Sequence, residues 1–161
     1  MKYFKQEENY RCGNACFRMV LSQLGLDDVS ESDLEVLMNT KWNSGTHYND
    51  MIGVAEKFDL QCVHGENGTL EQIDQLTKDG WVVVLAYSVD VPHYAVYMEN
   101  NGNHLFLHDP TFGEYHSYLI SKFEKKWLVD VSLYKVAIAE MDLKLDKSLD
   151  TYHWFVAYKK K

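Results

Sequence analysis

The sequence contains the four side-chain types that chemistry at a thiol requires, and they are Gln6, Cys12, His93 and Asp109. A thiolate nucleophile needs a base to take its proton, and the base needs a partner to orient it. Cys12 supplies the thiol, His93 the base, and Asp109 an acceptor for one ring nitrogen of the histidine. Gln6 supplies an amide N–H that, with the backbone N–H of Cys12, could bind the oxygen of a tetrahedral intermediate.

Cys12 lies directly ahead of an apolar pattern that recurs at helical spacing over residues 15–24, with Gly25 as the stop, so that Cys12 is expected in the first turn of this helix. The unpaired N–H groups and the dipole at the start of a helix favour a thiolate. Gly13 would leave room for a substrate backbone to approach. Cys16, one turn later, has the apolar neighbours of a packing cysteine. Taken alone, Cys12 could also be a packing residue, and Gln6 an exposed N-terminal glutamine.

The histidine and the aspartate occupy opposite ends of a predicted hairpin. Residues 93–99 and 104–109 have strand character, and an Asn-Asn-Gly-Asn turn separates them. Because the start of one antiparallel strand lies beside the end of its partner, His93 and Asp109 are predicted to be neighbours. Pro110 would end the second strand at that point.

The remaining patterns predict helices first and mostly antiparallel strands afterwards, an α+β layout in two layers. Three further helices are expected, over residues 30–40, 45–58 and 69–80, with caps at Ser30 or Ser32, at Thr46 and at Thr69. A valine-rich run over residues 81–89 predicts a buried central strand. Residues 121–128 are expected to be helical, and further strands could come from residues 131–141 and 151–159.

Length and patterning favour one domain over residues 1–161. Residues 1–80 form its mainly helical part with the candidate nucleophile, and residues 81–161 its mainly β part with the histidine and the aspartate. A hydrophobic content of 46% excludes wholesale disorder, and a net charge of −8 argues against a nucleic-acid partner.

The sequence has no apolar run of about 20 residues that could cross a bilayer, and no secretory signal at its start. Three cysteines, Cys12, Cys16 and Cys62, are too few and odd in number for a disulfide scaffold. We therefore expect a cytoplasmic protein with reduced thiols, although secretion without a signal stays open.

Other chemistries lack their motifs. No CxxC or HExxH pair is present, and His104 and His108 share a strand face but are only two ligands. Phosphate-binding glycine loops and the GxSxG elbow of serine hydrolases are also missing. No metal and no cofactor are expected.

The motifs resemble those of the papain-like cysteine peptidases that remove double-glycine leaders from bacteriocins and related peptides. The nucleophile motif of that family is Q-x4-D-C-G-x-A, and "QEENYRCGNAC" keeps its Gln, Cys-Gly and Ala. The family continues with H-[FY]-x-V, a hairpin and D-P, which "HYAVYMENNGNHLFLHDP" matches. Two more segments, "SGTHYNDMIGVAEKFDL" and "LISKFEKKWL", are similar to later elements of the family, so that the resemblance covers residues 4–128.

The resemblance implies a papain-like fold, in which a helix bearing the nucleophile packs on an antiparallel sheet. It also implies Cys12 as nucleophile, His93 as base, Asp109 as orienting residue and Gln6 in the oxyanion hole. Arg11 departs from the family pattern, which has Asp at this position. The best-known members are fused to an ATP-driven exporter, which nothing in this sequence encodes, so we expect a stand-alone form.

The leading hypothesis is a thiol hydrolase that cleaves a peptide or amide bond of a peptide or protein substrate. Papain-like folds also support acyltransferases and deamidases, which differ in the acceptor of the acyl group. A binding or immunity-type module without turnover is a third hypothesis. The sequence indicates no oligomeric state.

Overall fold

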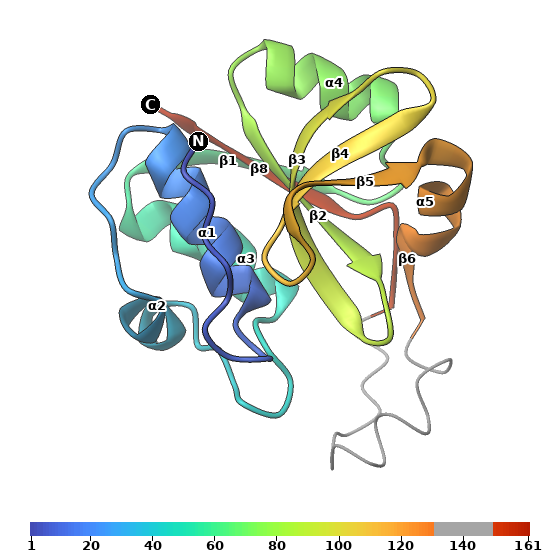
Figure 1. Ribbon diagram of the computed structural model, residues 1–161. Helices are drawn as coiled ribbons and strands as arrows, with labels where there is room; N and C mark the ends of the chain where they lie inside the picture. The colour runs from blue at the N-terminus through green and yellow to red at the C-terminus, as the bar shows by residue number, and fades with distance from the viewer. Residues whose placement is uncertain (131–149) are drawn as a thin grey trace.

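The computed structural model describes residues 1–130 and 150–161, in which six antiparallel strands form one sheet with helices on both faces (Figure 1). The helices are α1 (Cys12–Gln23), α2 (Glu31–Leu37), α3 (Tyr48–Lys57), α4 (Leu70–Lys78) and α5 (Ile120–Lys126). The large sheet contains β1 (Leu60–Gly65), β2 (Val82–Ser88), β3 (Pro92–Asn100), β4 (His104–Asp109), β5 (Gly113–Leu119) and β8 (Phe155–Lys160). A short pair is made by β6 (Leu128–Val129) and β7 (Thr151–Tyr152). The predicted α+β class with N-terminal helices on an antiparallel sheet is confirmed.

Local signals placed most helix ends. Ser30 accepts the backbone N–H of Asp33 at the start of α2, and Thr69 accepts that of Gln72 at the start of α4. The predicted cap at Thr46 is wrong, because His47 caps α3 through its side chain. The hydroxyl of Thr46 is instead 2.7 Å from that of Thr40 in the interior.

The strand order is β1-β8-β2-β3-β4-β5, so the last strand of the chain lies between the first two (Figure 1). The predicted central strand is β2, which pairs with β8 on one side and β3 on the other. The predicted hairpin is β3–β4, with a register shift between Tyr97 and Glu99. Strand β5 was not anticipated, and the strand suggested over residues 131–141 lies outside the described residues.

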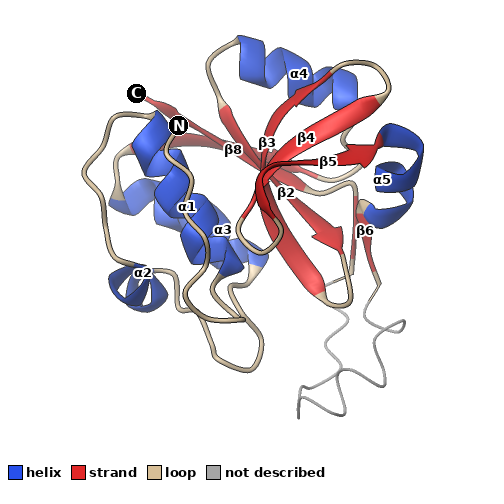
Figure 2. Ribbon diagram, viewed as in Figure 1, coloured by secondary structure: helices blue, strands red, loops and turns tan. Residues whose placement is uncertain are grey.

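The sheet is buried on both faces, which corrects the expected two layers to three (Figure 2). Helices α1, α2 and α3 cover one face, where their apolar side chains meet alternate residues of β2 such as Val82 and Val84. Helices α4 and α5 cover the other, where Ile73 and Phe123 meet Val83 and Leu85. Because β2 is apolar on both faces, it is apolar without interruption in the sequence.

In the part of the chain that the structure describes, no helix has the length and apolar character needed to span a membrane.

Candidate active site

Cys12 is the first residue of α1, as the sequence predicted. No side chain caps this helix, since Arg11 occupies the cap position and makes no cap hydrogen bond. The backbone N–H groups of the first turn therefore have no side-chain acceptor. The Cys12 side chain is nearly buried, with 7% exposed, and lines a small pocket together with His93.

His93 and Asp109 are in direct contact, as the hairpin predicted. The Nε2 atom of His93 lies 2.9 Å from Oδ1 and 3.1 Å from Oδ2 of Asp109. His93 is 5% exposed and Asp109 is fully buried. Because Asp109 engages Nε2, the other ring nitrogen, Nδ1, is the one that can exchange a proton with Cys12.

The electrostatics of the pair favour an imidazolium beside an ionised carboxylate. Burial lowers the pKa of His93, but the hydrogen bond with Asp109 and the interaction with the Cys12 thiol outweigh burial and raise this pKa to about 10. Burial raises the pKa of Asp109, but the hydrogen bond and charge of His93 outweigh it, and the net pKa is lowered. The cysteine, the histidine and the aspartate thus interact in series.

The Asp109 carboxylate is held by donors from three segments. Its Oδ1 accepts the backbone N–H of Thr111 at 2.8 Å and that of Phe112 at 2.9 Å, which closes the turn after β4. Its Oδ2 accepts the hydroxyl of Tyr87, a buried residue of β2. Sequence reasoning missed Tyr87, and no motif could have found it, because its contact depends on how β2 and β4 lie across the sheet.

Gln6 lies beside the turn that follows β4. Its backbone N–H donates to the carbonyl of Pro110 at 3.0 Å, and its Oε1 accepts the hydroxyl of Thr111 at 2.7 Å. One N–H of its amide donates to the carbonyl of Glu8 at 2.8 Å. Gln6 is therefore attached to the Asp109 turn, although it is not among the residues that line the pocket beside Cys12.

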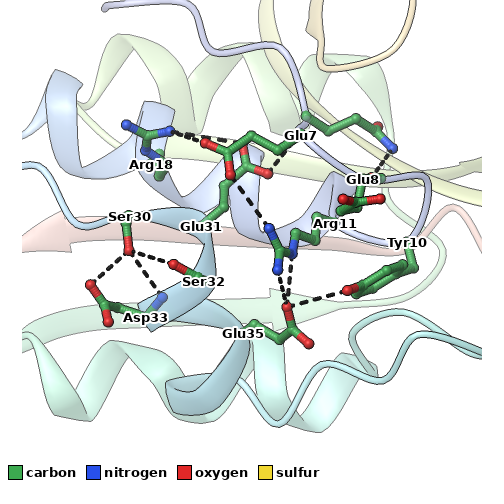
Figure 3. Close-up of polar contacts among 11 residues, drawn as sticks. Glu7, Glu8, Tyr10, Arg11, Arg18, Ser30, Glu31, Ser32, Asp33 and Glu35 are labelled. Atoms are coloured by element: carbon green, nitrogen blue, oxygen red, sulfur yellow. Dashed lines mark hydrogen bonds and ion pairs between the residues drawn. The ribbon is translucent and has the colours of Figure 1, made fainter.

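Arg11, which departs from the family motif, turns toward α2 (Figure 3). Its guanidinium pairs with Glu35 at 2.5 Å and with Glu7 at 3.4 Å. In the same cluster the backbone N–H of Glu7 donates to the buried Glu31 at 2.9 Å. These contacts fasten the segment before Cys12 to α2, and the positive charge of Arg11 is compensated by two carboxylates.

The pocket beside Cys12 is shaped by the loop before α3. Its lining consists of small or aromatic residues around the thiol and the imidazole, namely Ser44, Gly45, Thr46, Tyr48, Ala86, Pro92 and Tyr94. The hydroxyl of Tyr94 donates to the carbonyl of Thr46 at 2.9 Å and holds this loop against β3. Tyr94 therefore both lines the pocket and holds its loop in place.

Gly13 has a role other than the one expected. A Cβ atom there would lie 2.9 Å from Oγ1 of Thr46 and 3.1 Å from Sδ of Met51. The space beside Gly13 is thus filled by the protein itself, and the residue is small because α1 packs closely on the loop before α3.

The other two cysteines lie in less reactive surroundings. Cys16 is fully buried among core residues, and burial raises its pKa well above the usual value. Cys62 lies on β1, and burial raises its pKa to about 11. Within residues 1–130 and 150–161, no three His, Cys, Asp or Glu side chains are grouped so that they could hold a metal ion.

Comparison with known proteins agrees with the resemblance that the sequence motifs showed. The model of the peptidase C39 family matches residues 1–137. None of the curated proteins matches the chain in sequence. The solved structures similar to it include the peptidase domain of Streptococcus ComA, a bifunctional ABC transporter involved in quorum sensing, with a TM-score of 0.73 and 14% identity over 99% of this chain and 98% of that one.

Two further structures share the fold. A double glycine motif protease from an AMS/PCAT transporter, solved with its leader peptide, has a TM-score of 0.68 and 15% identity over 99% of this chain and 91% of that one. A protein from Bacillus anthracis described as a C39-like peptidase has a TM-score of 0.68 and 13% identity over 99% of this chain and 94% of that one. Each of these three matches covers 99% of the chain, whereas the motifs cover residues 4–128.

Proposed function

Because the chain belongs to the peptidase C39 family and is a cysteine peptidase, we propose that it cleaves peptide bonds through Cys12, His93 and Asp109, with Gln6 in the oxyanion hole. The observation that carries this proposal is the placement of His93, which interacts with the Cys12 thiol on one side and with Asp109 on the other. A histidine between a thiol and a buried carboxylate is the arrangement that nucleophilic catalysis by cysteine requires.

The reaction follows from these positions. The thiolate of Cys12 attacks the substrate carbonyl, and the C–N bond breaks as the His93 imidazolium gives its proton to the leaving amine. This leaves a thioester on Cys12. Water then attacks the thioester while His93 takes its proton, the C–S bond breaks, and the acid product leaves behind the Cys12 thiolate and the His93 imidazolium that began the cycle. Asp109 stays ionised and holds the imidazole by Nε2 throughout.

The oxygen of each tetrahedral intermediate is negative and needs donors. The backbone N–H of Cys12 at the uncapped start of α1 is one, and the dipole of that helix adds to it. We propose the Gln6 amide as the second donor. Its nitrogen carries two N–H groups, of which one donates to the Glu8 carbonyl and the other could donate to a substrate.

The substrate that we propose to test first is a peptide with two glycines before the cleaved bond. One neighbour in fold is a double glycine motif protease solved with a leader peptide. The pocket beside Cys12 suits small substrate residues such as glycine. Its lining includes Gly45, Ala86 and the rings of Tyr48 and Tyr94, which leave little volume for a larger side chain.

The test compares Cys12→Ala with Cys62→Ala in cleavage of such a peptide and in labelling by iodoacetamide at pH 8. Cys12→Ala should lose turnover by at least about a thousandfold. Cys62→Ala should keep the activity of the wild type, because Cys62 lies on β1 away from the pocket. Mass spectrometry of the wild type should find the label at Cys12 before Cys16 and Cys62, whose raised pKa values keep them protonated at this pH.

Turnover that survives in Cys12→Ala and disappears in Cys62→Ala would refute the assignment. Added amine acceptors should leave acid as the main product, whereas a dominant amide product would instead identify an acyltransferase. If no peptide is cleaved and no thioester forms, the protein has the fold without turnover and is a binding module.

A further inference from the structure

Tyr87 belongs to the centre of the site but not to its pocket. It lies on β2 opposite His93 in the strand register, and its side chain is fully buried. It is not among the residues that line the pocket beside Cys12. The Tyr87 hydroxyl therefore cannot touch a substrate, and any part it plays must be exerted through its neighbours.

Its hydroxyl donates to Oδ2 of Asp109. The two backbone N–H groups of the following turn occupy Oδ1, and His93 bridges both oxygens at 2.9 and 3.1 Å. Tyr87 is thus the one side chain besides His93 that bonds the carboxylate within the described part of the chain. Without that hydroxyl, Oδ2 would keep only the longer of the two contacts with His93.

The Tyr87 ring is itself held in place. It packs edge-on against His93, with ring centroids 5.5 Å apart and ring planes at 72°. It also contacts the tilted ring of Phe123 of α5, with centroids 5.3 Å apart. The hydroxyl of Tyr118 on β5 lies 3.4 Å from its own. Contacts from α5, β3 and β5 therefore fix the direction in which the hydroxyl points.

The charges agree with a donor rather than an acceptor. Burial, and the negative charge of Asp109, raise the pKa of Tyr87 far above its usual value, so the hydroxyl stays protonated. A fully buried carboxylate remains ionised only if hydrogen-bond donors of the protein replace the water molecules that it has lost.

We propose that Tyr87 is a positioning residue for the cleavage reaction, whose hydroxyl fixes the Asp109 carboxylate in the orientation that holds the His93 imidazole toward Cys12. This rests on the proposed triad. It adds a fourth member that never contacts the substrate and that reaches the nucleophile only through the aspartate and the histidine.

The experiment compares Tyr87→Phe with Tyr97→Phe. Tyr97 is the matched control because its buried hydroxyl also donates to a carboxylate, that of Asp74, away from the site. Tyr87→Phe should lower kcat by roughly tenfold or more, the size expected when one hydrogen bond to a charged group is lost, with KM nearly unchanged. Tyr97→Phe should leave both constants as in the wild type.

A readout independent of turnover is the carbon NMR titration of the Asp109 carboxyl. Its midpoint should move up by about one pH unit in Tyr87→Phe, because the ionised form loses a donor, and should stay in place in Tyr97→Phe. Replacement of Tyr87 by 3-fluorotyrosine, which keeps the ring and makes the hydroxyl a stronger donor, should move the midpoint down. This second variant serves if Tyr87→Phe does not fold.

A double-mutant cycle separates positioning from support of the core. In an Asp109→Asn background, Tyr87→Phe should add little further loss of kcat. An unchanged Asp109 midpoint, or full additivity with Asp109→Asn, would overturn the proposal and leave Tyr87 as a packing residue. The titration also separates the failure of this proposal from that of the triad. If the Asp109 midpoint shifts in Tyr87→Phe but the Cys12→Ala variant still cleaves, the triad is refuted, whereas the contact between Tyr87 and Asp109 stands.

Discussion

Asp109 is the side chain on which the most contacts of the site converge. It is fully buried, yet its pKa is lowered, because His93, Tyr87 and the Phe112 N–H together outweigh the cost of burial. The N-terminal segment reaches the same residue, since the Tyr3 hydroxyl donates to the Asp109 carbonyl at 2.8 Å. Asp109 therefore joins the N-terminal segment, His93 and the central strand β2.

The pH dependence of cleavage should report the Asp109–His93 contact. The pKa of His93 is raised to about 10, so the imidazolium that the proposed mechanism requires persists to high pH, and the alkaline limb of kcat/KM should lie near that value. In Asp109→Asn the negative charge of Asp109 that helps to raise this pKa is gone, while the interaction with Cys12 remains, so the limb should move down from about 10 in the direction of the ordinary histidine value of 6.5. Measurement of kcat/KM from pH 5 to 11 locates the alkaline limb in the wild type and in Asp109→Asn. An alkaline limb at the same pH in the two proteins would contradict the role of Asp109.

At the scale of elements, the start of α1 is held against the loop before α3. The hydroxyl of Thr40 lies 2.7 Å from that of Thr46 and accepts an N–H of the Asn14 amide at 3.0 Å, which joins α1, the segment after α2 and the loop in the interior. Gly13 completes this junction by leaving space for Thr46. The depth of Cys12 in its pocket is thus set by the packing of two elements rather than by α1 alone.

Replacement of two glycines by alanine should separate these effects. Gly13→Ala should destabilise the protein by about 1–2 kcal/mol, because its Cβ would press on Thr46 and Met51 at 2.9 and 3.1 Å. Gly53→Ala, inside α3 and with nothing within 4 Å of the added Cβ, should stabilise it by about 0.5–1 kcal/mol. Urea denaturation measures both. Equal stability of Gly13→Ala and the wild type would show that the loop yields freely.

The sequence predicted what depends on neighbours along the chain. The His93–Asp109 contact followed from a four-residue turn and strand alternation, and the start of α1 from an apolar period. The cap at Thr46 was wrong because a tertiary partner, Thr40, competes for its hydroxyl. Tyr87 could not be found, since its contact with Asp109 joins residues 22 positions apart across three strands.

At the scale of the whole molecule, β8 inserts between β1 and β2 and completes both apolar cores. Val156 and Tyr158 point to the face under α1 and α3, and Phe155 and Ala157 to the face under α4 and α5. The motifs gave no counterpart for this segment because strand order is a nonlocal property, and alternation along a strand does not identify its partners.

A charge placed on β8 tests how far the molecule depends on it. Val156→Asp buries a carboxylate at a fully buried position and should cost more than about 4 kcal/mol, enough to prevent folding of a marginally stable domain. The matched control is Val63→Asp on the edge strand β1, where the side chain is 37% exposed, and it should cost about 1 kcal/mol or less. Circular dichroism and soluble yield check both. A folded Val156→Asp protein would contradict the central role of β8.

The position of β8 also sets the order in which the sheet can be completed as the chain is synthesised. Synthesis from the N-terminus makes α1 early and the strands that carry His93 and Asp109 in the middle, but β1 and β2 lack the strand between them until residues 155–160 emerge. A growing chain therefore carries all its reactive groups before it has the scaffold that aligns them.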